Sequence, residues 1–515
     1  MTTDQAALVD PAAATTLPQL IHATAAAYGD DAAFILRREN CPDYSVSFAE
    51  LDTRSAELAR GLIARGVGKG SRVGFIMGNG PDFAITLAAI ARTGAIAIPV
   101  STLIKANELV RVLRQSDIAG LIVQRSLLGH DLVDRLCDAL PMLRTDGPEL
   151  WMAQTPYLRW IAATGPDLPP GIQDMTAITS AAVSVSPAIL TAMEAEIHPA
   201  DQLIEIYTSG SMALPKGVRH LHGPALYRTH YMSKMYQVER GETLAAALPM
   251  FWIGGLMMTL MPNWAAGATT LCTEATFASS QAAMGSVLAD DDLAALAMRP
   301  PFWALGMTET LGPYSYGSVV RMPGRPLCAP LDFIADRYDV RVADEAGNPV
   351  ADGQSGEIQV RGYALSPGLH KVERDPYYTP DGYYHTGDMG LVDGARIHFI
   401  GRDGDMIKTA GSNVSPAEVE LEMQHIDGVH NAYVIGLPDP ERGQLVVAAV
   451  VPRDGVTLDF DAIQASLRKR LSGFKVPRAY VAITRAEVPM LPSNKVARRQ
   501  IVTLMAQKLG RAEGL

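Results

Sequence analysis

Apolar and polar positions in the first quarter of the chain repeat with two different periods. Short apolar runs, typical of buried strands, occur at residues 33–36, 72–77, 95–100 and 120–123. Apolar residues at helical spacing occur in residues 51–63, 83–93 and 109–115. Ser47 and Glu50 have the spacing of a capping box, which predicts that a helix begins there. Strands that alternate with helices predict a parallel sheet covered by helices on both faces.

The same two patterns continue through the rest of the chain. They predict strands at residues 203–206, 340–342, 356–360, 406–408, 431–436 and 446–451, and helices at residues 221–235, 416–423 and 460–471. Residues 182–199 fit neither pattern and predict an irregular linker. Glycines and acidic residues cluster at 401–405, which predicts a boundary between an N-terminal domain (1–402) and a C-terminal domain (403–515). The predicted fold is α/β: a large N-terminal domain of layered α/β sheets plus a β subdomain, then a small α+β C-terminal domain.

Composition narrows the class of protein. The 515 residues are 48% hydrophobic and 19% charged, which predicts a globular protein and not a disordered one. The formal net charge is −11 and no basic block occurs, which argues against a general nucleic-acid binder. We expect a cytoplasmic enzyme with reduced thiols, because the N-terminus lacks the basic lead of a secretory signal and the cysteines lack metal-ligand spacing: Cys41, Cys137, Cys272 and Cys328.

Residues 243–273 contain no charged side chain and are numerous enough to span a bilayer. Pro249, Gly254 and Pro262 interrupt this segment, and no basic cluster flanks it. We therefore predict a buried strand, a turn and a buried helix here, with a membrane span as the alternative.

The most distinctive stretch, residues 207–217, follows a predicted strand and packs hydroxyl residues, glycines, a proline and a lysine into one turn. Glycines let backbone N–H groups approach an anion, and consecutive N–H groups form a concave anion nest. Hydroxyl donors and one lysine complete the set, so the expected ligand is a polyphosphate held by Thr208, Ser209, Gly210, Ser211, Lys216 and Gly217. The alternative is a flexible surface loop with an incidental lysine.

This loop differs from the P-loop of common nucleotide hydrolases, in which Gly-Lys is followed by Ser or Thr. Here Lys216 is preceded by Pro215 and followed by Gly217. The helix predicted at 221–235 is expected to direct its N-terminal region toward the phosphates.

Two further stretches contain candidate substrate and metal ligands. Phe251 and Trp252 stand beside a glycine pair, Gly254-Gly255, which predicts either a pocket wall for an apolar substrate or plain core residues. Glu309 stands among hydroxyl residues, where a carboxylate beside a triphosphate would hold Mg²⁺; alone, it would be an ordinary loop acid.

Two single residues complete the candidates. Asp388 is predicted in a turn, where it would accept hydrogen bonds from a ribose diol or simply stabilise the turn. Lys495 lies in a polar loop between apolar runs, a place where most lysines are solvated surface residues.

Together these stretches resemble, in order, the motifs of the adenylate-forming superfamily of acyl-CoA synthetases, adenylation domains and luciferases. The matching stretches are 207–217, 248–255, 306–310, 384–388, 401–405 with 408–420, 472–477 and 492–496. The resemblance implies a mobile C-terminal domain and the use of ATP, Mg²⁺ and coenzyme A. It implies two half-reactions: a carboxylate attacks the α-phosphorus of ATP and expels pyrophosphate, and a thiol then attacks the acyl-adenylate and expels AMP.

The resemblance also assigns roles to single residues. The loop residues Thr208 to Ser211 with Lys216 and Gly217 would hold the β- and γ-phosphates. Thr308 would contact the α-phosphate, Glu309 would bind Mg²⁺, Asp388 and Arg402 would contact the ribose hydroxyls, and Lys495 would bridge the carboxylate and the α-phosphate. Lys495, Thr308, Glu309 and Lys216 are thus the catalytic candidates, and Phe251, Trp252, Gly254 and Gly255 the acyl-binding ones.

The resemblance favours an acyl- or aryl-CoA ligase for an apolar acid, because no acidic residue that could pair with an amino group occurs in 251–255. One alternative is an enzyme that passes the activated acyl group to a carrier protein or an amine. Another is a catalytically weak nucleotide-binding relative. The expected partners are a small carboxylic acid and coenzyme A, without nucleic acid or an integral membrane segment; the sequence leaves a homodimer open.

Overall fold

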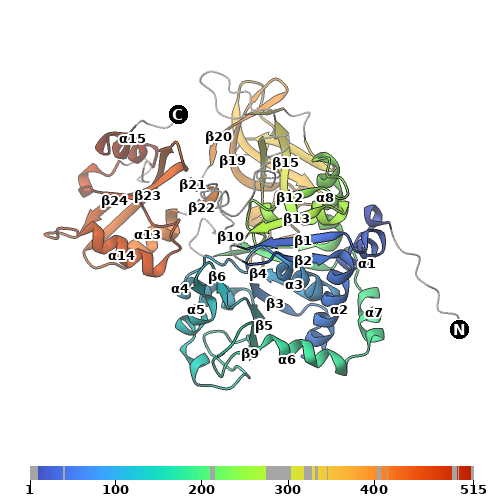
Figure 1. Cartoon of the computed structure of the whole chain (residues 1–515). Helices are drawn as coiled ribbons and strands as arrows, with labels where there is room; N and C mark the ends of the chain where they lie inside the picture. Colours follow the sequence, from blue (N-terminus) through green and yellow to red (C-terminus); the bar gives the residue numbers. More distant parts are fainter. Residues whose placement is uncertain are drawn as a thin grey trace.

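The computed structural model describes residues 10–38, 41–208, 215–273, 303–317, 328–330, 334–344, 346–402, 407–414, 416–489, 496 and 498–511. A large N-terminal domain and a small C-terminal domain lie side by side, the small one drawn in orange and red at the left of Figure 1. The α/β fold predicted from the sequence is confirmed. The predicted boundary at residue 402 stays a prediction, since residues 403–406 lie outside the described ranges.

A mostly parallel sheet forms the centre of the large domain. Its order is β11-β10-β4-β3-β5-β8-β9, and all neighbours are parallel except β10 and β11. The strands are β3 (Arg72–Ile76), β4 (Ile96–Pro99), β5 (Gly120–Val123), β8 (Trp160–Ala163), β9 (Gln173–Asp174), β10 (Gln202–Thr208) and β11 (Lys216–Leu221). The strands and helices predicted here are confirmed with boundaries shifted by a few residues.

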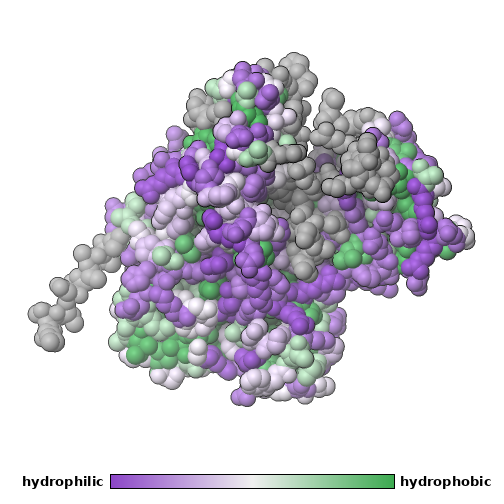
Figure 2. Space-filling view, turned by 180° about the vertical axis from the view of Figure 1, so that it is seen from behind, coloured by the Kyte–Doolittle hydropathy of each residue, from purple (hydrophilic) through white to green (hydrophobic). Residues whose placement is uncertain are grey.

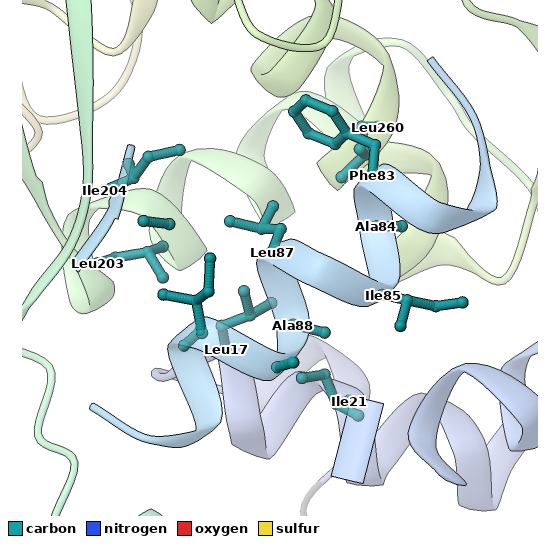
Figure 3. Packing of buried hydrophobic residues seen from close by; sticks show 14 of the residues in the cluster. Leu17, Ile21, Phe83, Ala84, Ile85, Leu87, Ala88, Leu203, Ile204 and Leu260 are labelled. Carbon is teal, nitrogen blue, oxygen red and sulfur yellow. The ribbon is translucent and has the colours of Figure 1, made fainter. Parts of the chain in front are cut away.

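Helices cover both faces of this sheet. One face packs on α1 (Leu17–Tyr28), α2 (Phe48–Ala64) and α3 (Pro81–Arg92), and the other on α4 (Ala106–Gln115) and α5 (Leu132–Ala139). The predicted capping box is present at the start of α2, where Ser47 accepts from the backbone of Glu50 and Glu50 accepts from the backbone of Ser47. In Figure 3, Leu17 of α1, Leu87 of α3 and Leu203 of β10 meet in one apolar cluster.

A second sheet, β12-β13-β1-β2, lies next to this core. Its strands are β1 (Ala32–Arg37), β2 (Tyr44–Ser47), β12 (Thr243–Ala245) and β13 (Thr269–Thr273). The uncharged segment supplies β12 and β13 and, between them, α9 (Ile253–Gly255), a π-helical turn (Leu256–Leu260) and α10 (Met261–Ala266). The predicted strand, turn and buried helix are therefore confirmed, with one additional strand at the end.

No single helix in the described ranges is long and apolar enough to cross a bilayer, although the bent pair 175–184 and 187–195 meets that test by length and composition.

This pair also corrects a prediction. Residues 182–199 are not irregular: α6 (Met175–Ser180) and a 3-10 turn (Ala181–Ser184) precede α7 (Pro187–Ala195), which Ser186 caps and Pro187 starts. Low at the left of Figure 2, a hydrophobic area lies where Figure 1 places α6 and α7; Val183 and Ile189, both exposed, belong to this segment.

The β subdomain completes the large domain after α8 (His222–Met235). Its antiparallel sheet has the order β16-β20-β19-β18-β17, and β14 pairs with β15 beside it. The strands are β14 (Trp303–Met307), β15 (Gly312–Gly317), β16 (Cys328–Pro330), β17 (Tyr338–Ala343), β18 (Ser355–Gly362), β19 (Tyr384–Asp393) and β20 (Arg396–Arg402).

The small domain is built on one mixed sheet with helices on both faces. Strands β21 (Ile407–Thr409), β22 (Ser412–Val414), β23 (Val429–Asp439), β24 (Gly443–Pro452) and β25 (Ala479–Ala482) form the sheet. One face packs on α13 (Pro416–Gln424) and α14 (Phe460–Arg470), and the other on α15 (Arg498–Lys508). The face with α13 and α14 is turned toward α4 of the large domain (Figure 1).

Replacing the buried Trp264 by alanine should lower the free energy of unfolding by about 3–5 kcal/mol. Trp264 is 1% exposed, packs edge-on against Phe34 and donates from Nε1 to the Thr24 hydroxyl at 3.1 Å, so its loss leaves a cavity and removes one hydrogen bond. Urea unfolding followed by circular dichroism measures the change. The matched control is Trp151→Ala: Trp151 is 74% exposed, and its loss should change stability by no more than about 0.5 kcal/mol. Equal effects of the two substitutions would contradict this description of the core.

Candidate active site

The candidate phosphate loop connects the two strands of the β10–β11 hairpin. Thr208 and Lys216 are cross-strand partners at the open end of this antiparallel pair, so the loop begins and ends at adjacent backbone positions. Ser209, Gly210 and Ser211 lie outside the described residues. The structure therefore places Thr208, Lys216 and Gly217 together at the rim of the predicted loop.

The helix expected to point at the phosphates lies elsewhere. Strand β11 returns along β10 until Leu221 pairs with Gln202, and α8 begins only at His222. The N-terminus of α8 is thus at the far end of the hairpin from the loop, and this prediction was wrong. The physical reason is the added strand: residues 216–221, which begin with the lysine, pair with β10 as β11 before any helix begins.

A buried charge stabilises the hairpin from behind. Glu205 of β10 is fully buried, and its carboxylate pairs with Arg72 of β3 at 2.5 Å. Gly217 lies directly over these groups: a Cβ built there would be 2.5 Å from Glu205 Oε1 and 2.8 Å from the Tyr207 hydroxyl. Burial, followed by the charge of Glu205, raises the pKa of Tyr207, which therefore remains protonated. Only glycine fits at position 217 without displacing these side chains.

Lys216 has an aromatic partner in the β subdomain. Its Nζ lies 4.5 Å from the centre of the Tyr377 ring, a cation–π distance. Residues 368–370 run beside β11, where the His370 N–H donates to the Gly217 carbonyl at 2.7 Å. The lysine is thus positioned by a strand on one side and by a segment of the β subdomain on the other.

Glu309 lies close to the same segment. It is 7% exposed, its Oε1 accepts from the Tyr384 hydroxyl at 3.1 Å, and its carbonyl accepts from the Ser366 N–H at 2.7 Å. No cluster of three or more His, Cys, Asp or Glu that could hold a metal ion occurs among the described residues. A single buried carboxylate fits Mg²⁺, which usually takes one or two carboxylates together with substrate phosphates and water.

Thr308, the candidate contact for the α-phosphate, is positioned from β11. His220 of β11 is fully buried against the Thr308 backbone, and burial lowers its pKa to about 3. A neutral imidazole therefore contacts the Thr308 backbone. Strand β11, which begins with Lys216, is thus also in contact with the candidate motif at 306–310.

Asp388 lies in a strand and not in the predicted turn. It belongs to β19, at a bulge where Met389 pairs with Glu357 and His385 with Gln359. The sequence predicts a turn at Asp388, where a glycine precedes it. In the structure Gly387 has a positive φ, and this conformation produces the bulge. Asp388 is 5% exposed and pairs across the sheet with Arg402 of β20, so the two ribose candidates are neighbours in the ladder.

A cavity of about 290 Å³ extends from the hairpin to the interface between the domains. Phe251, Trp252 and Gly254 line it, as predicted for an acyl pocket, together with Thr208 and Thr308. The two aromatic rings meet edge to face at 5.7 Å. Gly255 does not line the cavity; a Cβ there would meet the Pro249 carbonyl oxygen at 2.1 Å, so Gly255 serves the tight turn instead.

The small domain closes the cavity with residues that the sequence did not identify. Gly411 and Ser412 from the β21–β22 turn, and Phe474 and Lys475 after α14, line it opposite Glu108 and Arg111 of α4. The stretches 408–420 and 472–477 resemble family motifs, but the resemblance assigned no role to their residues. Glu108 offered no signal, because a glutamate in the first turn of a helix is ordinary.

Lys495 lies outside the described residues. Val496 packs with Ile501 and Met505 of α15, on the face of the sheet that is turned away from α13 and α14. Among the described residues, the cavity is lined by the α13–α14 side and not by Val496.

Comparisons with known proteins give matches over most of the chain. The profile of the family described as AMP-binding enzyme matches residues 21–305, and that of the AMP-binding enzyme C-terminal domain matches residues 418–495. A feruloyl-CoA synthase from Amycolatopsis is 28% identical, covering 93% of this chain and 95% of its own. An indoleacetate–CoA ligase from Aromatoleum aromaticum is 25% identical, covering 91% and 94%. A solved amide bond synthetase from Marinactinospora thermotolerans shares the fold with a TM-score of 0.73 and 21% identity, covering 95% and 99%.

Gly217→Ala should weaken binding of ATP about tenfold or more, because overpacking of this kind costs about 1–3 kcal/mol and must displace Glu205 or the hairpin. Isothermal titration calorimetry with ATP measures the affinity, and amide hydrogen exchange of β10 and β11 reports the displacement. The matched control is Gly147→Ala, where a Cβ meets nothing within 4 Å. Unchanged affinity and exchange in Gly217→Ala would refute the close approach described here.

Proposed function

We propose that this chain, which belongs to the AMP-binding enzyme family, activates a compact apolar carboxylic acid with ATP and transfers the acyl group to coenzyme A. The main support is the cavity, which joins the phosphate hairpin at Thr208 and Thr308 to an apolar wall at Phe251 and Trp252. Its volume of about 290 Å³ favours a compact aryl or short acyl group over a long chain.

In the first half-reaction the acid lies against Phe251 and Trp252, with its carboxylate toward Thr308. Thr208 and Lys216 hold the phosphates of ATP, and Asp388 with Arg402 holds the ribose. The carboxylate oxygen attacks the α-phosphorus, and the bond to pyrophosphate breaks. The protein contributes mainly positioning and charge stabilisation, because the phosphoryl group itself supplies the reactive centre. Bound Mg²⁺ would neutralise phosphate charge beside Glu309.

Lys495 supplies the remaining positive charge in this step. A lysine suits a group that must move, because its charge sits on a long flexible stem. In the domain arrangement described above, its neighbour Val496 is on the far face of the small domain. Adenylation therefore requires that the small domain rotate to bring Lys495 to the cavity.

In the second half-reaction a thiol attacks the acyl carbonyl and AMP leaves. The described arrangement suits this step, because Gly411 and Ser412 cover the cavity and the interface between the domains leads into it. Gly411 and Ser412 have small side chains, so they leave room at that point for a narrow pantetheine arm.

An enzyme that passes the acyl group to an amine is the second candidate; the fold does not separate the two, because it is shared by solved CoA ligases and by an amide bond synthetase. The acceptor distinguishes the two. Coenzyme A should give a thioester visible by mass spectrometry, whereas the alternative gives product only with an amine or a carrier protein.

A panel of acids incubated with ATP, Mg²⁺ and coenzyme A should show pyrophosphate release and thioester formation with compact aryl and short apolar acids. Long-chain acids and α-amino acids should react more slowly, because the cavity is small and residues 251–255 contain no carboxylate. Silence across the panel would favour the catalytically weak relative instead.

Lys495→Ala should reduce adenylation about a hundredfold, the usual effect of removing one transition-state charge partner. Thioester formation from supplied acyl-adenylate should be largely preserved, because Lys495 has left the site by then. Pyrophosphate exchange and a coupled thioester assay measure the two steps. The matched control is Lys469→Ala, an exposed lysine on α14. Equal loss in both steps would contradict the role of Lys495.

A further inference from the structure

Three buried charges meet where the two domains touch. Nζ of Lys475 lies 2.6 Å from Oε1 of Glu108 and 2.8 Å from Oε1 of Glu418. Glu108 belongs to α4 of the large domain, whereas Lys475 and Glu418 belong to the small domain. Ser472 joins them, with its Oγ 2.9 Å from both Glu108 Oε2 and the Leu103 carbonyl oxygen. One ammonium and one hydroxyl therefore connect the small domain to α4.

The group is buried, so its charges depend strongly on one another. The Glu108, Glu418 and Lys475 side chains are only 6%, 10% and 12% exposed. Burial alone would lower the pKa of Lys475, but the two carboxylates outweigh it and the pKa is raised. Burial raises the pKa of Glu418 against the opposing charge of Lys475. Removing the ammonium would leave two buried carboxylates facing each other, which is strongly unfavourable.

The group also exists in only one domain arrangement. A rotation of the small domain would carry Lys475 and Glu418 away from α4 and leave Glu108 without its ammonium partner. Arg111 of α4 and Glu422 of α13 form a second pair across the same interface at 2.9 Å, although Arg111 is more exposed. The buried group is therefore the stronger electrostatic contact that holds this arrangement.

We propose that Glu108, Lys475 and Glu418 form an interdomain latch that holds the small domain in the arrangement for thiol transfer. These are positioning residues: they line the cavity, and their contacts run across the boundary between the two domains. The inference rests on the proposed function in that it assigns the latched arrangement to the second half-reaction. Opening of the latch releases the small domain to bring Lys495 to the cavity, and closing sets Gly411 and Ser412 over it.

The central test is Lys475→Met, which keeps the length of the side chain and removes its charge. Thioester formation from supplied acyl-adenylate should slow about tenfold or more, because an unpaired buried carboxylate pair opposes the latched arrangement. Pyrophosphate exchange should be unchanged or faster, since adenylation uses the other arrangement. In a Lys475→Met variant that folds, equal slowing of both steps would overturn the proposal.

A direct readout follows the domains without catalysis. Spin labels at Glu57→Cys in α2 and Asp461→Cys in α14, both exposed, with Cys41→Ser as background, report the interdomain distance by double electron–electron resonance. Lys475→Met should broaden or shift the distance distribution of the ligand-free protein. An unchanged distribution together with unchanged thioester formation would overturn the latch.

Two further variants keep the test decisive. Lys475→Arg should restore the distance distribution and most of the thioester rate, whereas Lys469→Met on the exposed face of α14 should alter neither. If Lys475→Met fails to fold, Glu108→Gln serves instead: it removes only the charge that crosses the domain boundary and should shift the same two readouts. If the unaltered protein forms no thioester with any acid, the proposed function fails, while the spin-label distances still decide whether the latch exists.

Discussion

The ion pair between Glu205 and Arg72 is the interaction on which the candidate site depends. Glu205 is fully buried in β10, two residues before Tyr207, and a buried carboxylate is tolerated only when it is paired. The pair fixes β10 within the sheet and fills the space beneath Gly217. The backbone positions of Thr208 and Lys216, on either side of the phosphate loop, follow from it.

A single connection in the β subdomain then joins the two halves of the nucleotide site. The Ser366 N–H donates to the Glu309 carbonyl, and four residues later the His370 N–H donates to the Gly217 carbonyl. The candidate metal ligand and the phosphate hairpin are therefore fixed relative to each other by one short stretch of backbone. The candidate acyl wall at Phe251 and Trp252 lies in a different segment, directly before α9.

The sequence predicted the fold well wherever local pattern and tertiary packing agree. The strands and helices around β3, β4 and β5 show the apolar periods that burial on two faces requires, and they were recovered with small boundary errors. It failed where a tertiary contact decides the conformation. Strand β11 forms because it pairs with β10, and the bulge at Asp388 exists because β18 and β20 flank it. Helix α7 is a different case: its cap Ser186 and its first residue Pro187 are local signals in the sequence, and the prediction of an irregular segment overlooked them. The charges between Glu108 and Lys475 could not be predicted, because residues 367 positions apart meet only when two domains dock.

The aromatic face beneath Lys216 has a consequence for which anions the site retains. A cation–π contact at a partly exposed position stabilises the ammonium by about 0.5–1 kcal/mol and imposes no fixed direction on its N–H bonds. A single weakly bound anion gains little if binding must move Lys216 away from Tyr377. A polyphosphate that is also held elsewhere along its length can accept hydrogen bonds from Lys216 while the ammonium stays over the ring. Under the proposed function, Tyr377 would therefore favour extended polyphosphates over free inorganic phosphate at Lys216.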